Sequence, residues 1–303
     1  MKINKAAMVG LGAVGSVYAI HLFDYMKENF AVIAGGHRAE RIRKNGQTVN
    51  GVTFVPTVIE PENADWKADL ILLSMKNYQL EQAICDIRNI ITPDTILLPM
   101  CNGITAPDIL KKAFPSNKVL GGLCRIDTAR DQNGIVCSWE GPIQFGDRES
   151  SHISEEVQAV QELFDAAGVP HEVMPDIHRA MWLKFMTNVS LNQLSAVTHA
   201  CYGAFVDIPQ LNLAAREVME EVLAVAEAKG IHITAEDVED AMKDIASSAH
   251  DDKSSMLQDV EAKRKTETDY FAGTMIAEGK AVNVPTPWND RLYLLIKSIE
   301  QLY

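Results

Sequence analysis

The sequence lacks paired cysteines and long apolar runs. Its five cysteines are widely spaced and form no C-x-x-C pair, which excludes a disulfide framework or a zinc site of the usual kind, and no metal is expected. No apolar run reaches the roughly 18 residues that a membrane-spanning helix needs, and the N-terminus lacks the pattern of a signal peptide. We therefore expect a cytoplasmic protein that does not bind membranes.

Basic residues are also scarce. The chain has 28 lysines and arginines against 41 aspartates and glutamates, a formal net charge of −13. Such a surface would repel a phosphate backbone, so nucleic acid is excluded as a partner. An anionic small molecule would need positive charge gathered locally against the general field.

The length and the order of the sequence patterns predict two domains. With 303 residues the chain exceeds the roughly 100–200 residues of a usual single domain. Strand and helix patterns alternate over residues 1–174, with strands expected at 70–73, 95–100 and 118–124, antiparallel strands at a sheet edge over 135–147, and a closing helix at 152–167. Residues 175–303 show almost only helical periodicity, at 176–199, 208–229, 235–247, 255–278 and 288–302. We expect an α/β domain followed by an all-helical domain.

A glycine-rich turn lies almost at the start of the chain. Apolar residues 6–9 read as a strand, residues 16–23 read as a helix, and Gly10-Leu11-Gly12-Ala13-Val14-Gly15 lies where the two meet. At this spacing the first glycine permits the turn, the second lets backbone approach a pyrophosphate, and the third lets the helix pack on the strand. Strand, turn and helix together indicate a dinucleotide site, and the alternative is an ordinary glycine-rich turn.

The end of the second expected strand bears on which dinucleotide binds. No carboxylate follows residues 30–34, where a ribose 2′-hydroxyl would require one, whereas Arg38 and Arg41 would suit a 2′-phosphate. This pattern favours NADP(H). The alternative is that both arginines lie on the solvent-exposed face of a helix and bind no ligand.

Polar residues also follow two later strands. Lys76 comes after the apolar run 70–73, and Asn102 comes after the strand expected at 95–100. Ligands of open α/β sheets bind at the carboxyl ends of the strands, so both residues are candidate cofactor contacts.

One helix of the second domain carries an unusual polar stripe. Lys184, Asn188 and Asn192 fall at i, i+4 and i+8, on one face of a helix that is otherwise rich in apolar bulk. A lysine and two amides are costly to bury unless each has a partner, and a ligand could be that partner. A solvent stripe is the alternative, but such stripes usually mix glutamate with lysine and arginine. The acidic residues Glu217, Glu220 and Glu221 are, by contrast, expected to face solvent.

In order and spacing, the chain resembles the ketopantoate reductase (2-dehydropantoate 2-reductase) family from end to end. The motifs that carry the resemblance are 10–15, 75–79, Asn102-Gly103, Trp182-x-Lys184 with Asn188 and Asn192, 254–259 leading to Thr266-Glu267, and 284–287 followed by Asn289. The resemblance implies a Rossmann-type domain and a helical domain like the C-terminal domain of 6-phosphogluconate dehydrogenase. It implies NADPH-dependent reduction of 2-dehydropantoate to pantoate, on the route to pantothenate and coenzyme A.

The resemblance also implies roles for single residues. Lys184 would be the general acid that protonates the carbonyl oxygen, and Glu267 would act on the cofactor side of the site. Asn188 and Asn192 would orient the hydroxyl end of a small 2-keto acid, Ser255 would hold its carboxylate, and Asn102 would lie between substrate and cofactor. Lys76 would line the cofactor cleft, which is expected between the domains. A homodimer is one expected assembly.

Some features depart from the family pattern and keep alternatives open. Gly35 replaces the usual arginine, so the preference for NADP(H) depends on Arg38 or Arg41, and Tyr202 replaces a common amide. A same-fold reductase of another 2-keto acid is one alternative, and a dinucleotide sensor without turnover is another. Ser255 and Glu267 would lie about 18 Å apart on a straight helix, too far to contact one small substrate.

Overall fold

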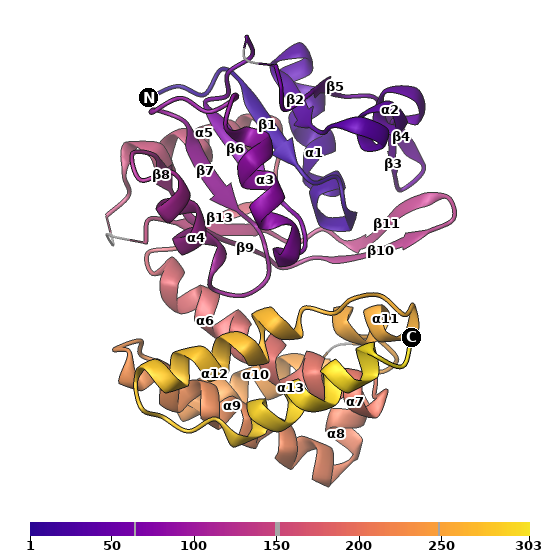
Figure 1. The fold of residues 1–303 in the computed structure, drawn as a ribbon, viewed down its shortest axis with the longest axis vertical. Coiled ribbons are helices and arrows are strands. Elements are labelled where there is room, and N and C mark those ends of the chain that lie inside the picture. Colours follow the sequence, from indigo (N-terminus) through magenta and orange to yellow (C-terminus); the bar gives the residue numbers. More distant parts are fainter. Residues whose placement is uncertain (64, 149–151, 248) are drawn as a thin grey trace. The chain divides into compact units, whose positions relative to one another are not determined.

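The computed structural model describes residues 1–63, 65–148, 152–247 and 249–303. The chain forms two compact units (Figure 1). Unit 1 comprises Met1–Asn102 and Ala106–Ile177, and unit 2 comprises Gly103–Thr105 and His178–Tyr303. Among the described helices, none is both long and apolar enough to cross a membrane.

Unit 1 is built on a six-stranded parallel sheet. Its strands are β1 (Ala6–Val9), β2 (Phe30–Ile33), β5 (Thr57–Ile59), β6 (Leu70–Leu73), β7 (Ile96–Pro99) and β8 (Lys118–Val119). Their spatial order is β5-β2-β1-β6-β7-β8, and every pair is parallel. This is the strand order of a dinucleotide-binding Rossmann sheet, in which the order reverses between β1 and β6.

Helices cover both faces of this sheet. Side chains alternate along each strand, so Met8 of β1 belongs to one core and Val9 to the other. The first core is closed by α1 (Ala13–Met26), α2 (Gly36–Asn45) and α5 (Glu155–Ala167). The second is closed by α3 (Leu80–Ile87) and α4 (Ala106–Ala113) (Figure 1). Short 3₁₀ turns, η1 (Lys27–Asn29) and η2 (Asn77–Gln79), lead into β2 and α3.

Two smaller sheets complete unit 1 and correct two expectations. The first has the order β10-β11-β3-β4 and the second β13-β12-β9. Their strands are β3 (Gln47–Val49), β4 (Val52–Phe54), β9 (Gly121–Cys124), β10 (Asp127–Asp131), β11 (Gly134–Trp139), β12 (Ile143–Gly146) and β13 (His171–Val173). The expected single strand at 118–124 is therefore wrong, because it divides between two sheets. The strands expected to extend the main sheet over 135–147 belong to the smaller sheets instead.

Glycines explain why the chain leaves the main sheet after β8. A Cβ at Gly122 would lie 2.6 Å from the carbonyl oxygen of Pro99, and a Cβ at Gly121 would lie 2.9 Å from the side chain of Ile177. Glycine at 122 lets the backbone pass this close to β7, and glycine at 121 leaves room for Ile177. The pattern of apolar residues in the sequence does not reveal such a close approach between backbone segments.

The regular elements among the described residues of unit 2 are all helical. Its elements are α6 (Ile177–Thr187), η3 (Asn188–Asn192), α7 (Gln193–Thr198), α8 (Ala204–Asp207), α9 (Pro209–Ala228), α10 (Ala235–Ser247), α11 (Ser255–Glu261), η4 (Thr268–Tyr270), α12 (Ala272–Ala281) and α13 (Pro287–Glu300). The single helix expected over 255–278 is wrong. Lys263 has a positive φ of 52°, and the next residue, Arg264, bonds back to buried Asp259 at 3.0 Å, so the chain turns after α11.

The acidic face of α9 also differs from its expected role. Glu221 accepts hydrogen bonds from the backbone N–H groups of Trp288 and Asn289 at 2.6 and 3.2 Å, and from the side-chain amide of Asn289 at 2.9 Å. Glu217 accepts the indole N–H of Trp288 at 2.9 Å. These two carboxylates bind the N-terminus of α13, where free N–H groups favour an anion. Of the three acidic residues, only Glu220 is exposed.

We expect Glu221→Ala to lower the free energy of unfolding by about 1.5–3 kcal/mol, because it leaves donors of α13 without their charged acceptor. Glu220→Ala is the matched control, since it removes a neighbouring carboxylate that is exposed, and should change stability by less than about 0.5 kcal/mol. Urea unfolding of both variants measures the difference. Equal stabilities would contradict a capping role for Glu221.

Candidate functional site

The glycine turn joins β1 to α1 and is shaped by its first and third glycines. Gly10 has a φ of +94°, and a Cβ there would lie 2.1 Å from the carbonyl oxygen of Ser74. A Cβ at Gly15 would lie 2.2 Å from the carbonyl oxygen of Gly10. Gly12 is different, because a Cβ there would meet no atom within 4 Å. The first and third glycines are therefore required for packing, and the second leaves its backbone open to an approaching group.

The turn is also electrostatically suited to an anion. Gly12 is the N-cap of α1, and no acidic residue lies in the first helical turn. The hydroxyl of Ser16 donates to the carbonyl oxygen of Gly12 at 2.6 Å, which fixes the turn. Backbone N–H groups at such a helix N-terminus attract phosphate.

The ends of β6 and β7 adjoin the glycine turn, as expected for the point where strand order reverses. The backbone N–H of Ser74 donates to the carbonyl oxygen of Val9 at 2.9 Å, which places Lys76 just beyond the end of β1. The amide of Asn77 donates to the carbonyl oxygen of Asn102 at 2.7 Å, so the tips of β6 and β7 are tied together. Lys76 and Asn102 are both half-buried.

Arg38 and Arg41 both lie on α2, directly after β2. Both side chains are exposed, and the first turn of α2 contains no acidic residue. Gly35 is the N-cap of this helix.

The polar stripe of unit 2 lies on a helix with a π turn. Residues 177–198 are helical, as expected, but Asn188–Asn192 forms the π-helical turn η3 between α6 and α7. A π turn contains more residues per turn than an α turn, so each residue rotates less about the helix axis. The side chain of Asn192 therefore lies on the same face of the helix as that of Asn188. The side-chain amide of Asn192 accordingly lies 3.4 Å from the amide oxygen of Asn188.

Lys184 lies one turn before Asn188, at the end of α6 that leads into η3. It is half-buried, whereas its neighbours Trp182 and Phe185 are fully buried and stack edge to face with ring centroids 5.8 Å apart. The aromatic pair anchors the helix in the core of unit 2 and leaves the lysine at the edge of that core.

Ser255 joins this stripe from a distant part of the sequence. Its hydroxyl lies 3.5 Å from the side-chain amide of Asn192, at the start of α11. The preceding residue, Ser254, is fully buried, accepts the N–H of Leu257 at 3.1 Å and lies 2.6 Å from the hydroxyl of Ser195 on α7. Ser254 thus fastens α11 to α7 and sets Ser255 beside Asn192.

Glu267 lies in the chain between α11 and η4 and is only 2% exposed. The next residue, Thr268, donates to the side-chain oxygen of Gln193 at 3.2 Å, and Gln193 in turn donates to Asn289 at 3.2 Å. This buried network attaches the Glu267 segment to α7 and α13. Because α11 ends at Glu261, the 18 Å separation expected for a straight helix between Ser255 and Glu267 does not apply.

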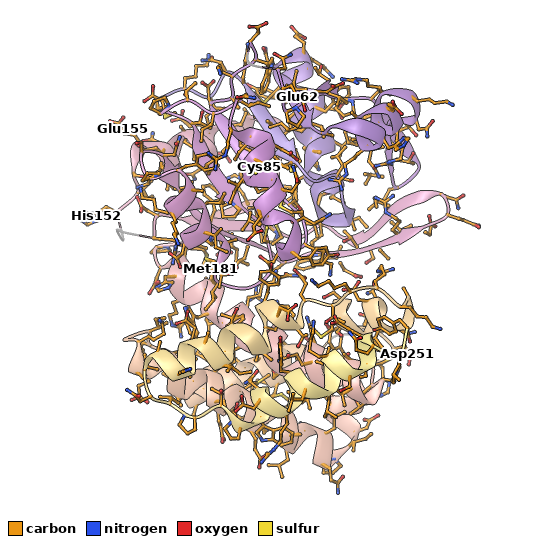
Figure 2. The ribbon with its side chains drawn as sticks, viewed as in Figure 1. Glu62, Cys85, His152, Glu155, Met181 and Asp251 are labelled. Carbon is orange, nitrogen blue, oxygen red and sulfur yellow. The ribbon has the colours of Figure 1, made fainter. Side chains whose placement is uncertain are left out.

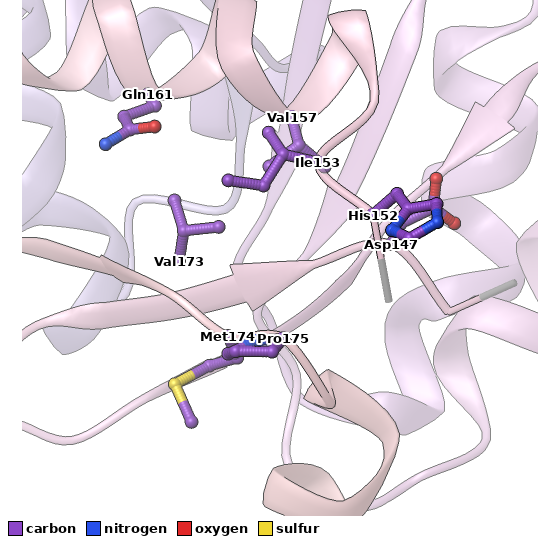
Figure 3. Close-up of a pocket in the computed structure, with 8 residues that line it drawn as sticks. All are labelled: Asp147, His152, Ile153, Val157, Gln161, Val173, Met174 and Pro175. Atoms are coloured by element: carbon purple, nitrogen blue, oxygen red, sulfur yellow. The ribbon is translucent and has the colours of Figure 1, made fainter. Parts of the chain in front are cut away.

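One pocket in unit 1 contains none of the predicted site residues. It has a volume of about 200 Å³ and lies beside α5 and β13 (Figure 3). Its lining residues are Asp147, His152, Ile153, Val157, Gln161, Val173, Met174 and Pro175. Asp147 already forms an ion pair with Lys118. The pocket therefore adds no chemistry to the predicted site.

Cysteines and metal-binding groups add nothing further to the site. Cys85 is exposed on α3 (Figure 2), and all five cysteines are free thiols. Within the described residues, no cluster of three or more histidine, cysteine, aspartate or glutamate side chains could hold a metal ion.

Family models match both units of the chain. The model described as "Ketopantoate reductase PanE/ApbA" matches residues 6–150, and its C-terminal counterpart matches residues 176–300. The chain belongs to the ketopantoate reductase family. The Rossmann-type and helical fold that the sequence predicted is confirmed.

Individual ketopantoate reductase relatives are similar over nearly their whole length. The 2-dehydropantoate 2-reductase of Vibrio cholerae is 28% identical to this chain over 97% of both. The crystal structure of 2-dehydropantoate 2-reductase from Methylococcus capsulatus superposes with a TM-score of 0.85 at 26% identity, covering 98% of this chain and 97% of that one. A structure of D-mandelate dehydrogenase with NADH and anilino(oxo)acetate has a TM-score of 0.87 at 23% identity, covering 98% of both chains, and shares the fold.

Sequence reasoning missed one charged residue beside the glycine turn. Arg130, on β10, extends a side-chain nitrogen to 3.4 Å from the carbonyl oxygen of Leu11. The short hairpin of β10 and β11 has a recognisable turn signal in Asn133-Gly134, but β10 itself carries few apolar residues. The charged residues and the Asn133-Gly134 turn together could have identified the hairpin. They could not have predicted that the hairpin places Arg130 beside the glycine turn.

Proposed function

We propose that this ketopantoate reductase family member reduces 2-dehydropantoate to pantoate with NADPH as the hydride donor. The observation that carries the proposal is the cluster of Asn188, Asn192 and Ser255, one helical turn from Lys184. Two amides, a hydroxyl and a cation form the set that a small hydroxylated keto acid requires, and membership of the ketopantoate reductase family supports this type of reaction.

The residues of unit 1 fit a nicotinamide dinucleotide. The open backbone at Gly12 and the acid-free start of α1 suit a pyrophosphate, and Lys76 and Asn102 lie at the neighbouring strand tips. When bound, the cofactor supplies the hydride. Arg38 or Arg41 would provide the positive charge that favours NADPH over NADH.

Unit 2 supplies the groups that act on the substrate. Addition of hydride to a keto group builds negative charge on its oxygen, and Lys184 donates the proton that neutralises this charge. Asn188 and Asn192 orient the hydroxyl end, and Ser255 binds the carboxylate. Glu267 acts on the cofactor side of the reaction, and Asn102 contacts both ligands.

A substrate panel tests the proposal. Oxidation of NADPH is followed with 2-dehydropantoate, with isosteric 2-keto acids and with benzoylformate, the keto acid that corresponds to mandelate. We expect the highest kcat/KM with 2-dehydropantoate. A higher value with another keto acid would support a same-fold reductase of that acid, an alternative favoured by Tyr202 and by the likeness to D-mandelate dehydrogenase. Binding of dinucleotide without turnover of any acid would indicate a sensor.

Ser254 and Ser255 provide an internal contrast. We expect Ser255→Ala to raise KM for the keto acid about 10-fold or more without changing stability, because this side chain is exposed and its proposed partner is a carboxylate. Ser254→Ala should instead lower the free energy of unfolding by about 1–2 kcal/mol, because it removes a buried helix cap. Steady-state kinetics and urea unfolding of both variants check this. An unchanged KM in Ser255→Ala would contradict the assigned role.

The cellular setting follows from the same proposal. Pantoate is a precursor of pantothenate and coenzyme A, so the reaction would take place in the cytoplasm. A homodimer stays a prediction, and light scattering of the purified protein measures the oligomeric state directly.

A further inference from the structure

Arg130 on β10 lies beside the glycine turn in unit 1, and Arg41 on α2 lies near Arg130; we call these two residues the basic pair. The side chain of Arg130 approaches the carbonyl oxygen of Leu11 at 3.4 Å, within the turn itself. Burial of the guanidinium and the nearby charge of Arg41 both lower the pKa of Arg130 from its usual value. The two positive groups therefore lie close enough to repel each other.

The hairpin that carries Arg130 is firmly attached to the elements around the turn. The side chain of Asn50 makes two hydrogen bonds to the backbone of Cys137, at 2.8 and 3.1 Å, and its N–H donates to Ile135 at 2.9 Å. The hydroxyl of Tyr18 on α1 donates to the carbonyl oxygen of Gly141 at 2.8 Å. Burial of this phenol raises its pKa, so the hydroxyl stays protonated and remains a donor. The position of Arg130 over the turn is thus set by the fold.

Neither member of the pair is neutralised. Considering only residues that the structure describes, neither Arg41 nor Arg130 forms an ion pair with a carboxylate. Arg43, on the same helix as Arg41, differs because it pairs with Glu60 at 2.6 Å. A chain with net charge −13 has ample acidic residues to neutralise these arginines, and none of those that the structure describes does so. A partly buried cation beside a second cation is costly unless an anion joins them.

We propose that Arg130 and Arg41 together bind the 2′-phosphate of the dinucleotide, which makes the β10–β11 hairpin a determinant of cofactor choice. The inference rests on the cofactor part of the proposed function. A dianionic phosphate satisfies two guanidinium groups at once, and arginine binds phosphate through paired N–H donors. Arg41 follows β2, where a Rossmann unit recognises the adenosine ribose, and Arg130 reaches the glycine turn from β10.

Binding measurements without keto acid test the pair separately from the proposed reaction. NADPH, NADH, 2′,5′-ADP and 5′-AMP are titrated into the wild-type protein, Arg130→Gln, Arg41→Gln and Arg43→Gln. We expect the first two variants to weaken binding of NADPH and 2′,5′-ADP roughly 10- to 100-fold, and to change binding of NADH and 5′-AMP less than about twofold. Arg43→Gln is the matched control and should bind all four ligands as the wild type does.

Three other outcomes would contradict the inference. Equal losses for NADPH and NADH would assign the pair to the pyrophosphate instead, and unchanged binding in Arg130→Gln would remove the hairpin from the site. Equal wild-type affinities for NADPH and NADH would also refute it. Retained affinity for NADH shows that a variant is folded. Arg130→Lys, which keeps the charge but loses the paired donors, should give an intermediate loss for NADPH.

Discussion

Lys184→Ala is expected to lower kcat by about 10²- to 10⁴-fold and to leave NADPH affinity nearly unchanged. Lys184 is the cation on the polar stripe, one turn from Asn188, and in the proposed mechanism it donates its proton only as charge develops on the keto oxygen. An interaction made in the transition state affects kcat, whereas an interaction that only anchors substrate affects KM. Steady-state kinetics with both substrates varied separate the two effects.

Two further variants make the Lys184 experiment specific. Asn188→Ala removes the next residue of the stripe and should act mainly on KM, because its proposed partner is the hydroxyl end of the substrate. Glu267→Ala tests whether a second group supplies the proton. If kcat is preserved in Lys184→Ala, Lys184 is not the proton donor, even if the protein reduces 2-dehydropantoate. Cofactor titration of each variant confirms that the dinucleotide site remains intact.

Gly10→Ala is expected to prevent stable folding or to lower the free energy of unfolding by more than about 3 kcal/mol. The backbone of Gly10 has a φ of +94°, and its added Cβ would lie 2.1 Å from the carbonyl oxygen of Ser74. That oxygen belongs to backbone at the end of β6 and cannot move without disturbing the centre of the sheet. Circular dichroism and thermal unfolding measure the loss.

Gly12→Ala is the control that separates binding from folding at the same turn. Gly12 has a φ of −76°, which alanine adopts readily, and a Cβ there would meet no atom within 4 Å. We expect this variant to fold with stability within about 1 kcal/mol of wild type. Its NADPH affinity should fall at least about 10-fold, because the new methyl group lies where the backbone receives the pyrophosphate. Unchanged affinity would contradict a dinucleotide site at this turn.

Local sequence patterns were sufficient for the central strands of the Rossmann sheet, although not for β5 at its edge. Four-residue apolar runs such as Leu70–Leu73 are typical of strands in a sheet that is buried on both faces. The helical periodicity between these runs indicates helical crossovers, which connect parallel strands. The glycine spacing predicted the turn because Gly10 and Gly15 each have a steric reason, whereas Gly12 leaves its backbone open. The same logic fails for residues 118–124, where close approach to Pro99 divides one apolar run into two strands.

The candidate site in unit 2 was predicted only in part, because its geometry depends on contacts between distant segments. Spacing placed Lys184, Asn188 and Asn192 on one helix face, but the π turn that aligns the two amides has no periodic signature. Ser255 reaches Asn192 because buried Ser254 fastens α11 to Ser195, 59 residues earlier in the chain. Such a hydrogen bond leaves no trace in local composition.

The sequence alone determined the family, most of the strands and helices, and the residue types at the site, because these follow from short-range periodicity, glycine sterics and motif spacing. Tertiary structure decided which of these residues meet. It ended α11 at Glu261, assigned Glu217 and Glu221 to the start of α13, and placed Arg130 over the glycine turn. The last two outcomes depend on pairing between residues far apart in the chain, and the energy of such pairs is set by burial that only the folded chain creates.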